Sequence, residues 1–122
     1  MRYESKYFNP IEYRSPDDRT SGHKISDRLL IALDYVREQL EVPLILNSAY
    51  RSEAHNTRVG GVPNSQHRLG RAADIRIDSQ EMGDQIEYHF KEFTHNICGI
   101  GRYNTFIHVD VRDVAAYWDN RT

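Results

Sequence analysis

The sequence has only one cysteine, Cys98, among its 122 residues. A single thiol excludes an intramolecular disulfide, and it excludes a structural zinc site made mostly of sulfur ligands. Cys98 stands between Ile97 and Gly99, a context that indicates a small buried apolar residue. The chain is long enough to form one apolar core without disulfides, and we expect a single domain over residues 1–122. We also expect a monomer.

The sequence also lacks an excess of basic residues and a long apolar run. Sixteen Lys and Arg side chains stand against eighteen Asp and Glu, so the formal net charge is -2. This balance argues against nucleic acid as a partner, because a surface that binds nucleic acid shows a basic excess. No run approaches the roughly 20 apolar residues of a membrane span, and the start has no apolar stretch of signal-peptide length. We therefore expect a protein that stays in the cytoplasm unless something else releases it.

The first half of the chain predicts an arm, a helix and a strand. Residues 1–23 place aromatic side chains among turn-forming residues, which indicates an N-terminal arm laid on the core. Apolar residues recur at three- and four-residue steps over residues 24–41, which predicts an amphipathic helix. Residues 44–48 predict a short buried strand, and Ser52 can cap a brief helix after it.

The second half alternates strands and a helix. Residues 73–78 read as a half-buried strand, and residues 79–93 predict a second long helix that begins with a serine cap. Residues 97–103 and 106–112 predict the two strands of a hairpin, followed by a short closing helix or a tail over residues 113–122. This order predicts an α+β domain in which helices pack against a small, largely antiparallel sheet.

Three side chains have the residue types and the placement of a zinc site. His67 follows a loop with Gly and Asn, and Asp74 lies on the polar face of the strand that comes after it. A catalytic zinc usually takes three protein ligands and leaves a fourth position for water. The best third candidate is His108, because strand alternation puts His108 and Asp110 on one face. Spacing alone leaves a hydrogen-bonded structural role open for each histidine, and a surface ion pair open for Arg51.

A family resemblance adds to this pattern. The chain resembles the zinc D-Ala-D-Ala carboxypeptidase family, which includes bacterial D,D-peptidases, the D,D-dipeptidases of vancomycin resistance and many phage endolysins, with the hedgehog signalling domain as a structural relative. The resemblance runs from Ile45 to Arg112. It is carried by Ser48-Ala49-Tyr50-Arg51, Asn56, Gly60-Gly61, Asn64-Ser65-Gln66-His67, Gly70, Ala72, Asp74 and His108-Val109-Asp110.

The resemblance implies a peptidase whose Zn²⁺ is bound by His67, Asp74 and His108. It also implies that Arg51 contacts the substrate, and a guanidinium suits a carboxylate or a developing oxyanion. Ser65 can donate a hydrogen bond at the mouth of the same loop, although a turn role suits it equally. The implied substrate is a peptidoglycan stem peptide, cut at a D-alanine or cross-link bond. The small size would suit a phage or prophage lysis enzyme that acts on the cell wall after release.

The sequence departs from the family at the expected general base. Many members carry an acidic residue three positions before the last zinc histidine, where this chain has Thr105. A hydroxyl cannot replace a carboxylate in that task. Asp110 is the nearest carboxylate in sequence, and we predict that it supports His108 and can also take a proton from the attacking water. The competing hypotheses are a zinc-stabilised domain that binds cell-wall peptide or another protein, and a structural part of a phage tail.

Overall fold

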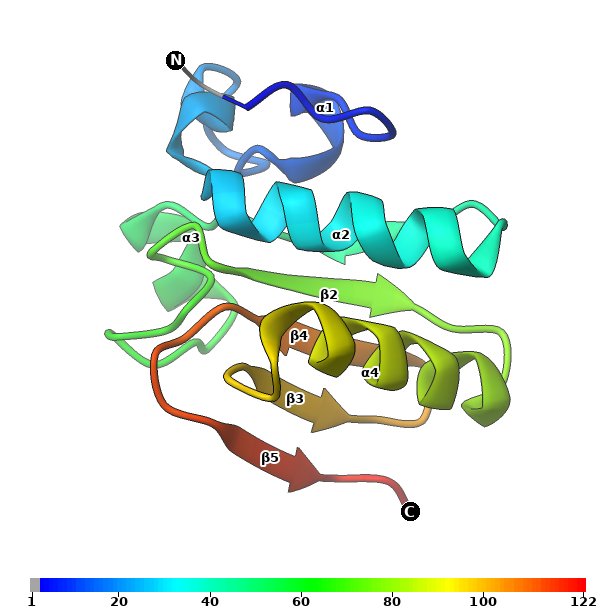
Figure 1. The fold of residues 1–122 in the computed structure, drawn as a ribbon. Helices are drawn as coiled ribbons and strands as arrows, with labels where there is room; N and C mark the ends of the chain where they lie inside the picture. Colours follow the sequence, from blue (N-terminus) through cyan, green and yellow to red (C-terminus); the bar gives the residue numbers. More distant parts are fainter. Residues whose placement is uncertain (1–2) are drawn as a thin grey trace.

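The computed structural model describes residues 3–122, in which one five-stranded sheet carries the functional candidates (Figure 1). The strand order is β1-β2-β4-β3-β5, and every neighbouring pair is antiparallel except β3 and β5, which run parallel. The strands are β1 (Leu46–Ser48), β2 (Ala72–Arg76), β3 (Gly99–Arg102), β4 (Phe106–Asp110) and β5 (Ala116–Asp119). The expected α+β class with a largely antiparallel sheet is confirmed.

Two long helices cover one face of the sheet (Figure 1). They are α2 (Asp27–Leu40) and α4 (Gln80–Thr94), and each begins at a serine, Ser26 or Ser79, whose side chain accepts a hydrogen bond from a backbone N–H of the first turn. Their apolar faces meet fully buried sheet residues such as Ile75 and Ile107. Burial of this kind is the main stabilising contribution in a domain that has no disulfide.

The pleat of the two central strands separates core residues from functional ones. Ile75 of β2 and Ile107 of β4 are paired and belong to the apolar core. Their neighbours Asp74 and His108, also paired across the two strands, point to the opposite face because side chains alternate along a strand. The face turned away from α2 and α4 therefore carries the candidate site.

The expected N-terminal arm contains two short helices. These are α1 (Pro10–Tyr13), which has a capping box between Asn9 and Glu12, and the 3-10 helix η1 (Ser21–Lys24). A buried carboxylate, Asp34 of α2, accepts hydrogen bonds from the hydroxyl groups of Tyr3 and Ser5. The hydrogen bond to Asp34 raises the pKa of Tyr3 to about 12. Met1 and Arg2, the first residues of that arm, lie outside the described residues.

Three expectations about secondary structure need correction. Residues 113–122 contain the strand β5 and not a closing helix, because Ala116–Asp119 pairs with the edge of β3 that β4 leaves free. β1 is an edge strand with partly exposed side chains and not a buried one, since only β2 pairs with it. Helix α2 begins at Asp27, three residues later than expected, because η1 takes up the preceding turn.

The short central helix appears where the serine cap predicted it, as α3 (Glu53–Arg58). Ser52 accepts a hydrogen bond from the backbone N–H of His55 at 3.1 Å, which fixes the start of this helix. Within residues 3–122, no helix has the length and the apolar character that a membrane span requires.

Candidate metal centre

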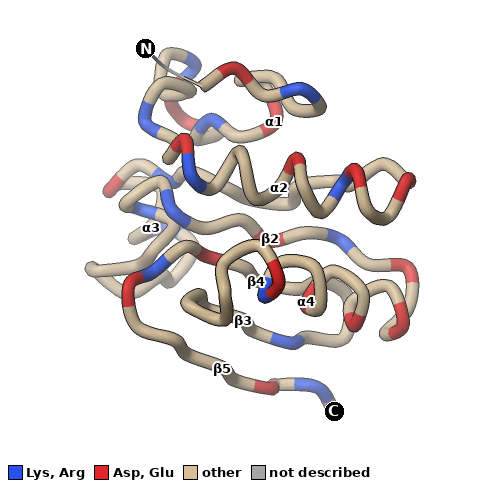
Figure 2. The backbone as a smooth tube through the Cα atoms, in the orientation of Figure 1, with Lys and Arg blue, Asp and Glu red and all other residues tan. Residues whose placement is uncertain are grey.

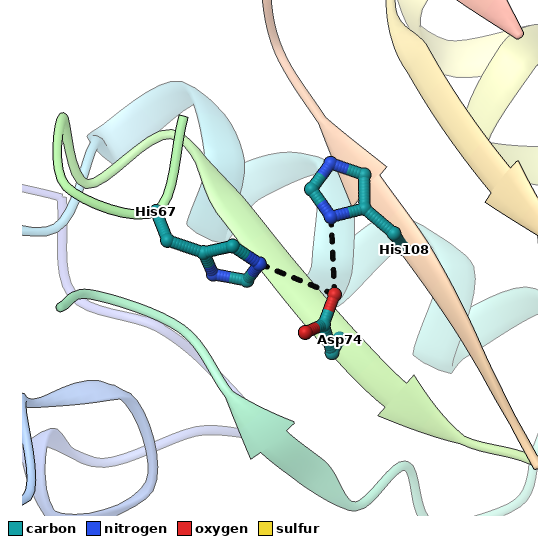
Figure 3. Close-up of side chains that lie close together, drawn as sticks. All are labelled: His67, Asp74 and His108. Carbon is teal, nitrogen blue, oxygen red and sulfur yellow. Dashed lines mark hydrogen bonds and ion pairs between the residues drawn. The ribbon is translucent and has the colours of Figure 1, made fainter. Parts of the chain in front are cut away.

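Three side chains from two strands and a loop converge on the face of the sheet that is turned away from α2 and α4 (Figure 3). Asp74 Oδ1 lies 3.2 Å from His67 Nε2 and 3.0 Å from His108 Nδ1. One ligand atom from each of the three lies within 4.8 Å of the other two. The structure thus brings together the three residues that the sequence singled out as metal ligands.

The backbone holds the ring of His67. Its Nδ1 lies 2.8 Å from the carbonyl oxygen of Ala49, and since a carbonyl can only accept, Nδ1 carries the proton and donates. Nε2 is then the nitrogen that faces Asp74, and it is the one that would offer its lone pair to a metal ion. A fixed tautomer of this kind is what a metal-binding imidazole needs.

A carboxylate holds the ring of His108, and here the donating nitrogen is Nε2 instead of Nδ1. Its Nε2 donates to Asp110 Oδ2 at 2.7 Å, so Nδ1 is the nitrogen that faces Asp74. Burial lowers the pKa of His108, but the hydrogen bonds to Asp110 and Asp74 outweigh it and raise the pKa above its usual value. Two carboxylates facing one ring favour a positive charge at this position, either a proton or a metal ion.

The carboxyl of Asp74 is held in its ionised form. Burial raises its pKa, but hydrogen bonds from His108 and His67 outweigh burial and keep the pKa well below the usual range. Arg51 adds an ion pair, with Nη2 at 3.4 Å from Asp74 Oδ2. An ionised oxygen between two imidazoles is therefore the state that the surroundings of Asp74 stabilise.

Arg51, expected to contact substrate, lies beside the triad with long hydrogen bonds. Its Nε donates to Ser48 Oγ at 3.1 Å and its Nη1 donates to Asn56 Oδ1 at 3.4 Å. Asn56 is buried and also donates to the carbonyl of Val62 at 2.8 Å, so it ties α3 to the following loop. These contacts direct the guanidinium toward the triad while they bind it loosely.

Ser65, the second expected substrate contact, has a structural hydrogen bond in the same loop. Its hydroxyl oxygen accepts from the backbone N–H of His67 at 3.2 Å, which is the turn role considered from the sequence. Ser65 also lines a cleft beside the triad, together with His108. The turn contact leaves the hydroxyl proton of Ser65 free to donate elsewhere.

Asp110 lies behind His108 and is fully buried. Besides the bond from His108, it accepts one from the backbone N–H of Arg112 at 3.2 Å and two from its guanidinium, from Nε at 2.8 Å and from Nη2 at 2.6 Å. Burial raises the pKa of the Asp110 carboxyl, but the bonds from Arg112 and His108 hold it well below its usual range. These contacts are those of a residue that orients His108. Within residues 3–122, no contact of Asp110 supports its predicted second role as a general base.

Arg112 and Trp118 are site residues that sequence reasoning missed. The guanidinium carbon of Arg112 lies 5.4 Å from the ring centroid of Trp118, whose ring lies 5.0 Å from that of His108. Strand alternation from His108 and Asp110 could have indicated Arg112. Trp118 gave no comparable signal, because its place depends on β5 pairing with β3.

Two glycines of β3 make room for these side chains. A Cβ atom on Gly101 would lie 2.4 Å from ring atoms of Trp118, and one on Gly99 would lie 2.3 Å from Asp110 Oδ2. Heavy atoms cannot approach so closely, so any side chain at either position would displace the group above it.

The donor set fits Zn²⁺ better than a harder cation. Two imidazole nitrogens and one carboxylate oxygen match a catalytic zinc set, whereas Mg²⁺ and Ca²⁺ prefer oxygen ligands. Tetrahedral zinc with bonds of about 2.1 Å separates its ligand atoms by roughly 3.4 Å. The 3.0 Å and 3.2 Å separations about Asp74 Oδ1 are close to that value.

Thr105 lies in the turn before β4, away from the triad. Its carbonyl accepts from the backbone N–H of Ile77, just beyond the end of β2. Position 105 is three residues from His108, or about 10 Å along a strand. A carboxylate at position 105 would start from the turn before β4. The position that departs from the family pattern is therefore remote from the triad.

The chain matches a known family model. The family model described as Peptidase M15 matches residues 9–110, which include all three residues of the triad. The matched range ends before Arg112 and Trp118. No curated protein matches the chain.

Proposed function

This chain belongs to the peptidase M15 family of metallopeptidases, and from that premise we propose that it is a zinc-dependent peptidase that cleaves peptidoglycan stem peptides. The proposed bonds are those next to D-alanine or at a cross-link. The observation that supports it most is the convergence of His67 Nε2, Asp74 Oδ1 and His108 Nδ1, each ring held in the tautomer that a metal requires. These three residues are the proposed zinc ligands.

Zinc bound by this set would acidify a water molecule and polarise the scissile carbonyl. The chain itself supplies the orientation of the two rings and the positive charge of Arg51. We assign to Arg51 the recognition of a substrate carboxylate or of the developing oxyanion, because its contacts to Asn56 and Asp74 are long, at 3.4 Å, and are easily exchanged for a charged partner. Ser65 would donate its hydroxyl proton to the substrate from the adjoining loop.

For Asp110 we propose the orienting role. Its carboxylate lies on the side of His108 that faces away from Asp74, and Arg112 binds both of its oxygens. A proton on the attacking water would have to pass the imidazole to reach it.

The biological setting belongs to the same proposal. A single domain over residues 1–122 with an arm at residues 1–23, acting as a monomer, would suit a lysis enzyme of a phage or prophage. Such an enzyme would be made in the cytoplasm and reach the cell wall after release.

The deciding experiment is a turbidity assay on purified peptidoglycan with and without a chelator. We expect clearing that stops on chelation and returns with Zn²⁺, and no clearing by His108→Ala. The matched control is His23→Ala, which alters an exposed histidine of η1. Clearing that a chelator leaves unchanged would contradict a zinc peptidase.

Arg51 can distinguish a carboxypeptidase from an endopeptidase. Arg51→Lys keeps the charge and loses the planar fork, so turnover should fall while zinc content stays. A carboxypeptidase should lose most on substrates with a free C-terminal carboxylate. Equal losses on amidated substrates would indicate an oxyanion role, and unchanged kinetics would make Arg51 a structural residue.

A second candidate function is a zinc-stabilised domain that binds cell-wall peptide without cutting it. The observations that favour it are Thr105 in the usual acidic position and the engagement of Asp110 by Arg112. In that case the protein should cosediment with peptidoglycan in a zinc-dependent manner and release no amino groups. The turbidity assay separates the two functions directly.

A further inference from the structure

A cleft of about 280 Å³ adjoins the metal centre on the His108 side. One wall comes from the loop between α3 and β2, and the other comes from β4, β5 and the segment between them. Its lining residues are Val62, Asn64, Ser65, Gln66, His108, Arg112 and Trp118. Because His108 belongs to the triad, the cleft opens onto the proposed reaction centre. Its volume lies just below the range of whole ligand pockets, which suits a subsite for one part of a substrate.

The β5 wall of this cleft is a fixed aromatic surface. The indole of Trp118 lies directly on Gly101, and its Nε1 donates to the hydroxyl of Tyr103 at 2.8 Å. Arg112 lies over the indole, but both of its bonds to Asp110 neutralise its charge locally. This wall therefore offers the part of the indole that Gly101 and Arg112 leave exposed, with little net charge.

The loop wall contains a polar atom that lacks a partner. Gln66 Oε1 is buried and accepts no hydrogen bond from residues 3–122. A buried acceptor without a donor is unfavourable, and Gln66 lines the cleft, so a ligand whose N–H reaches this oxygen would gain from the contact. Peptide groups combine an N–H donor with a flat face that can lie against an aromatic wall.

The two ends of the site differ in charge. Asp74 and His108 of the triad lie on the central strands β2 and β4. Arg51 follows the edge strand β1, and Trp118 lies on the opposite edge strand β5. Figure 2 shows basic and acidic residues interspersed over much of the fold, so the difference between the two ends is local to the site. Beside the triad, the positively charged Arg51 lies on the β1 side. The cleft, which has little net charge, lies on the β5 side.

We propose that Gln66 and Trp118 form the subsite for the acyl side of the peptide substrate, with the leaving side toward Arg51. This inference rests on the proposed function, because it uses the same centre. The substrate would lie across the sheet from β5 to β1. The amide oxygen of Gln66 would accept a backbone N–H of the residue on the N-terminal side of the cut bond, and the indole would pack against that part of the chain.

The chain offers a direct probe, since Trp118 is its single tryptophan. Zinc-loaded protein is titrated with two acyl-side fragments that need no cleavage, N-acetyl-L-lysyl-D-alanine and N-acetyl-L-alanyl-γ-D-glutamate, while fluorescence is recorded. We expect a saturable change with at least one fragment and none with free D-alanine, which has only the leaving side. Gln66→Ala should weaken the binding by about 3- to 10-fold, the effect of one neutral hydrogen bond.

The matched control is Gln85→Ala, an exposed glutamine on α4, which should bind like the unchanged protein. Zinc content and thermal unfolding of Gln66→Ala show whether the variant is folded, and Trp118→Phe should keep part of the affinity measured by calorimetry. The proposal is wrong if neither fragment changes the fluorescence, if free D-alanine changes it equally, or if Gln66→Ala binds normally. Fragment binding through Gln66 without any peptidoglycan hydrolysis would retain the subsite and reject the peptidase.

Discussion

The two histidines of the triad face the same carboxylate oxygen, but different kinds of structure support them. His67 donates to the backbone carbonyl of Ala49, whereas His108 donates to the side chain of Asp110, which Arg112 holds. A backbone carbonyl stays in place under substitution of its own side chain. The support of His108 depends on a charged pair that one substitution can remove. The difference indicates that one half of the centre is fixed by the fold and the other half by a few side chains.

The largest effect should come from removing the histidines themselves, and it should be equally large for His67 and for His108. His67→Ala and His108→Ala each remove one of three ligands, and zinc should fall from about one ion per chain to almost none. Metal analysis after dialysis measures this, with His23→Ala as the control. Undiminished zinc in both variants would show that the triad is not a metal site. Thermal stability should fall with the zinc, because metal binding contributes to folding.

Removing the charged support of His108 should have the next largest effect. Asp110→Asn keeps the shape of the side chain but removes its charge, so a purely orienting residue should lose about 10- to 100-fold in zinc affinity. A general base should instead lose roughly 100-fold or more in turnover with zinc retained. Competition with a chromophoric chelator and steady-state kinetics separate the two outcomes. If neither zinc affinity nor turnover changes, Asp110 neither orients His108 nor acts as a general base.

Arg112 should have a smaller effect, because it acts on His108 only through Asp110. Arg112→Met removes both bonds to the carboxylate and should weaken zinc binding by about 3- to 10-fold. Arg112→Lys keeps the charge but loses the bidentate geometry, so it should fall between Arg112→Met and the unchanged protein. The measurement is the same chelator competition. A loss as large as that of His108→Ala would mean that Arg112 does more than hold Asp110.

The sequence predicted the triad and the support of His108 by Asp110, but it missed the support of His67 and the place of Trp118, for a physical reason. Strand alternation indicated the directions of Asp74 and His108, and the family resemblance strengthened their assignment as metal ligands together with His67 in the loop. The carbonyl of Ala49 carries no side-chain signal at all. Trp118 lies on a strand of four residues, and only the free edge of β3 decides that this segment pairs there instead of forming a helix. Long-range pairing of a short segment is not encoded in its own pattern.

The starts of the helices could be predicted from the sequence more fully than the position of β1 in the sheet. Ser26, Ser52 and Ser79 each begin a helix, and two of these caps were predicted because the cap is a local interaction. The position of β1 at an edge was not, because burial of a strand depends on its neighbours in the sheet. The proposed acyl subsite lies between a loop and β5, so it too required the tertiary structure.

The smallest effect should come from the support of His67, which is spread over several weak contacts. The segment from Ala49 to Ser52 is tied to the N-terminal arm by two backbone donors, Tyr50 N–H to the carbonyl of Tyr13 at 3.1 Å and Ser52 N–H to Ser15 Oγ at 3.0 Å. Asp17 adds a third tie, since it accepts from the hydroxyl of Ser52 at 2.7 Å. Asp17→Asn should therefore leave zinc affinity unchanged and lower the melting temperature only slightly.

The pH dependence of that small effect has a definite sign. Hydrogen bonds from Ser15 and Ser52 lower the pKa of Asp17 from 3.8 to about 2 in the folded chain. A carboxyl whose folded pKa is depressed stabilises the fold above its unfolded pKa and loses that contribution as pH falls through the folded value. The difference in unfolding free energy between the unchanged protein and Asp17→Asn should be constant above about pH 5 and should shrink toward pH 2. Denaturant unfolding across this range measures it, and a difference independent of pH would show that Asp17 is not held by the two serines. If Asp17→Asn changes the zinc affinity, the orientation of His67 depends on a single side chain, as that of His108 does.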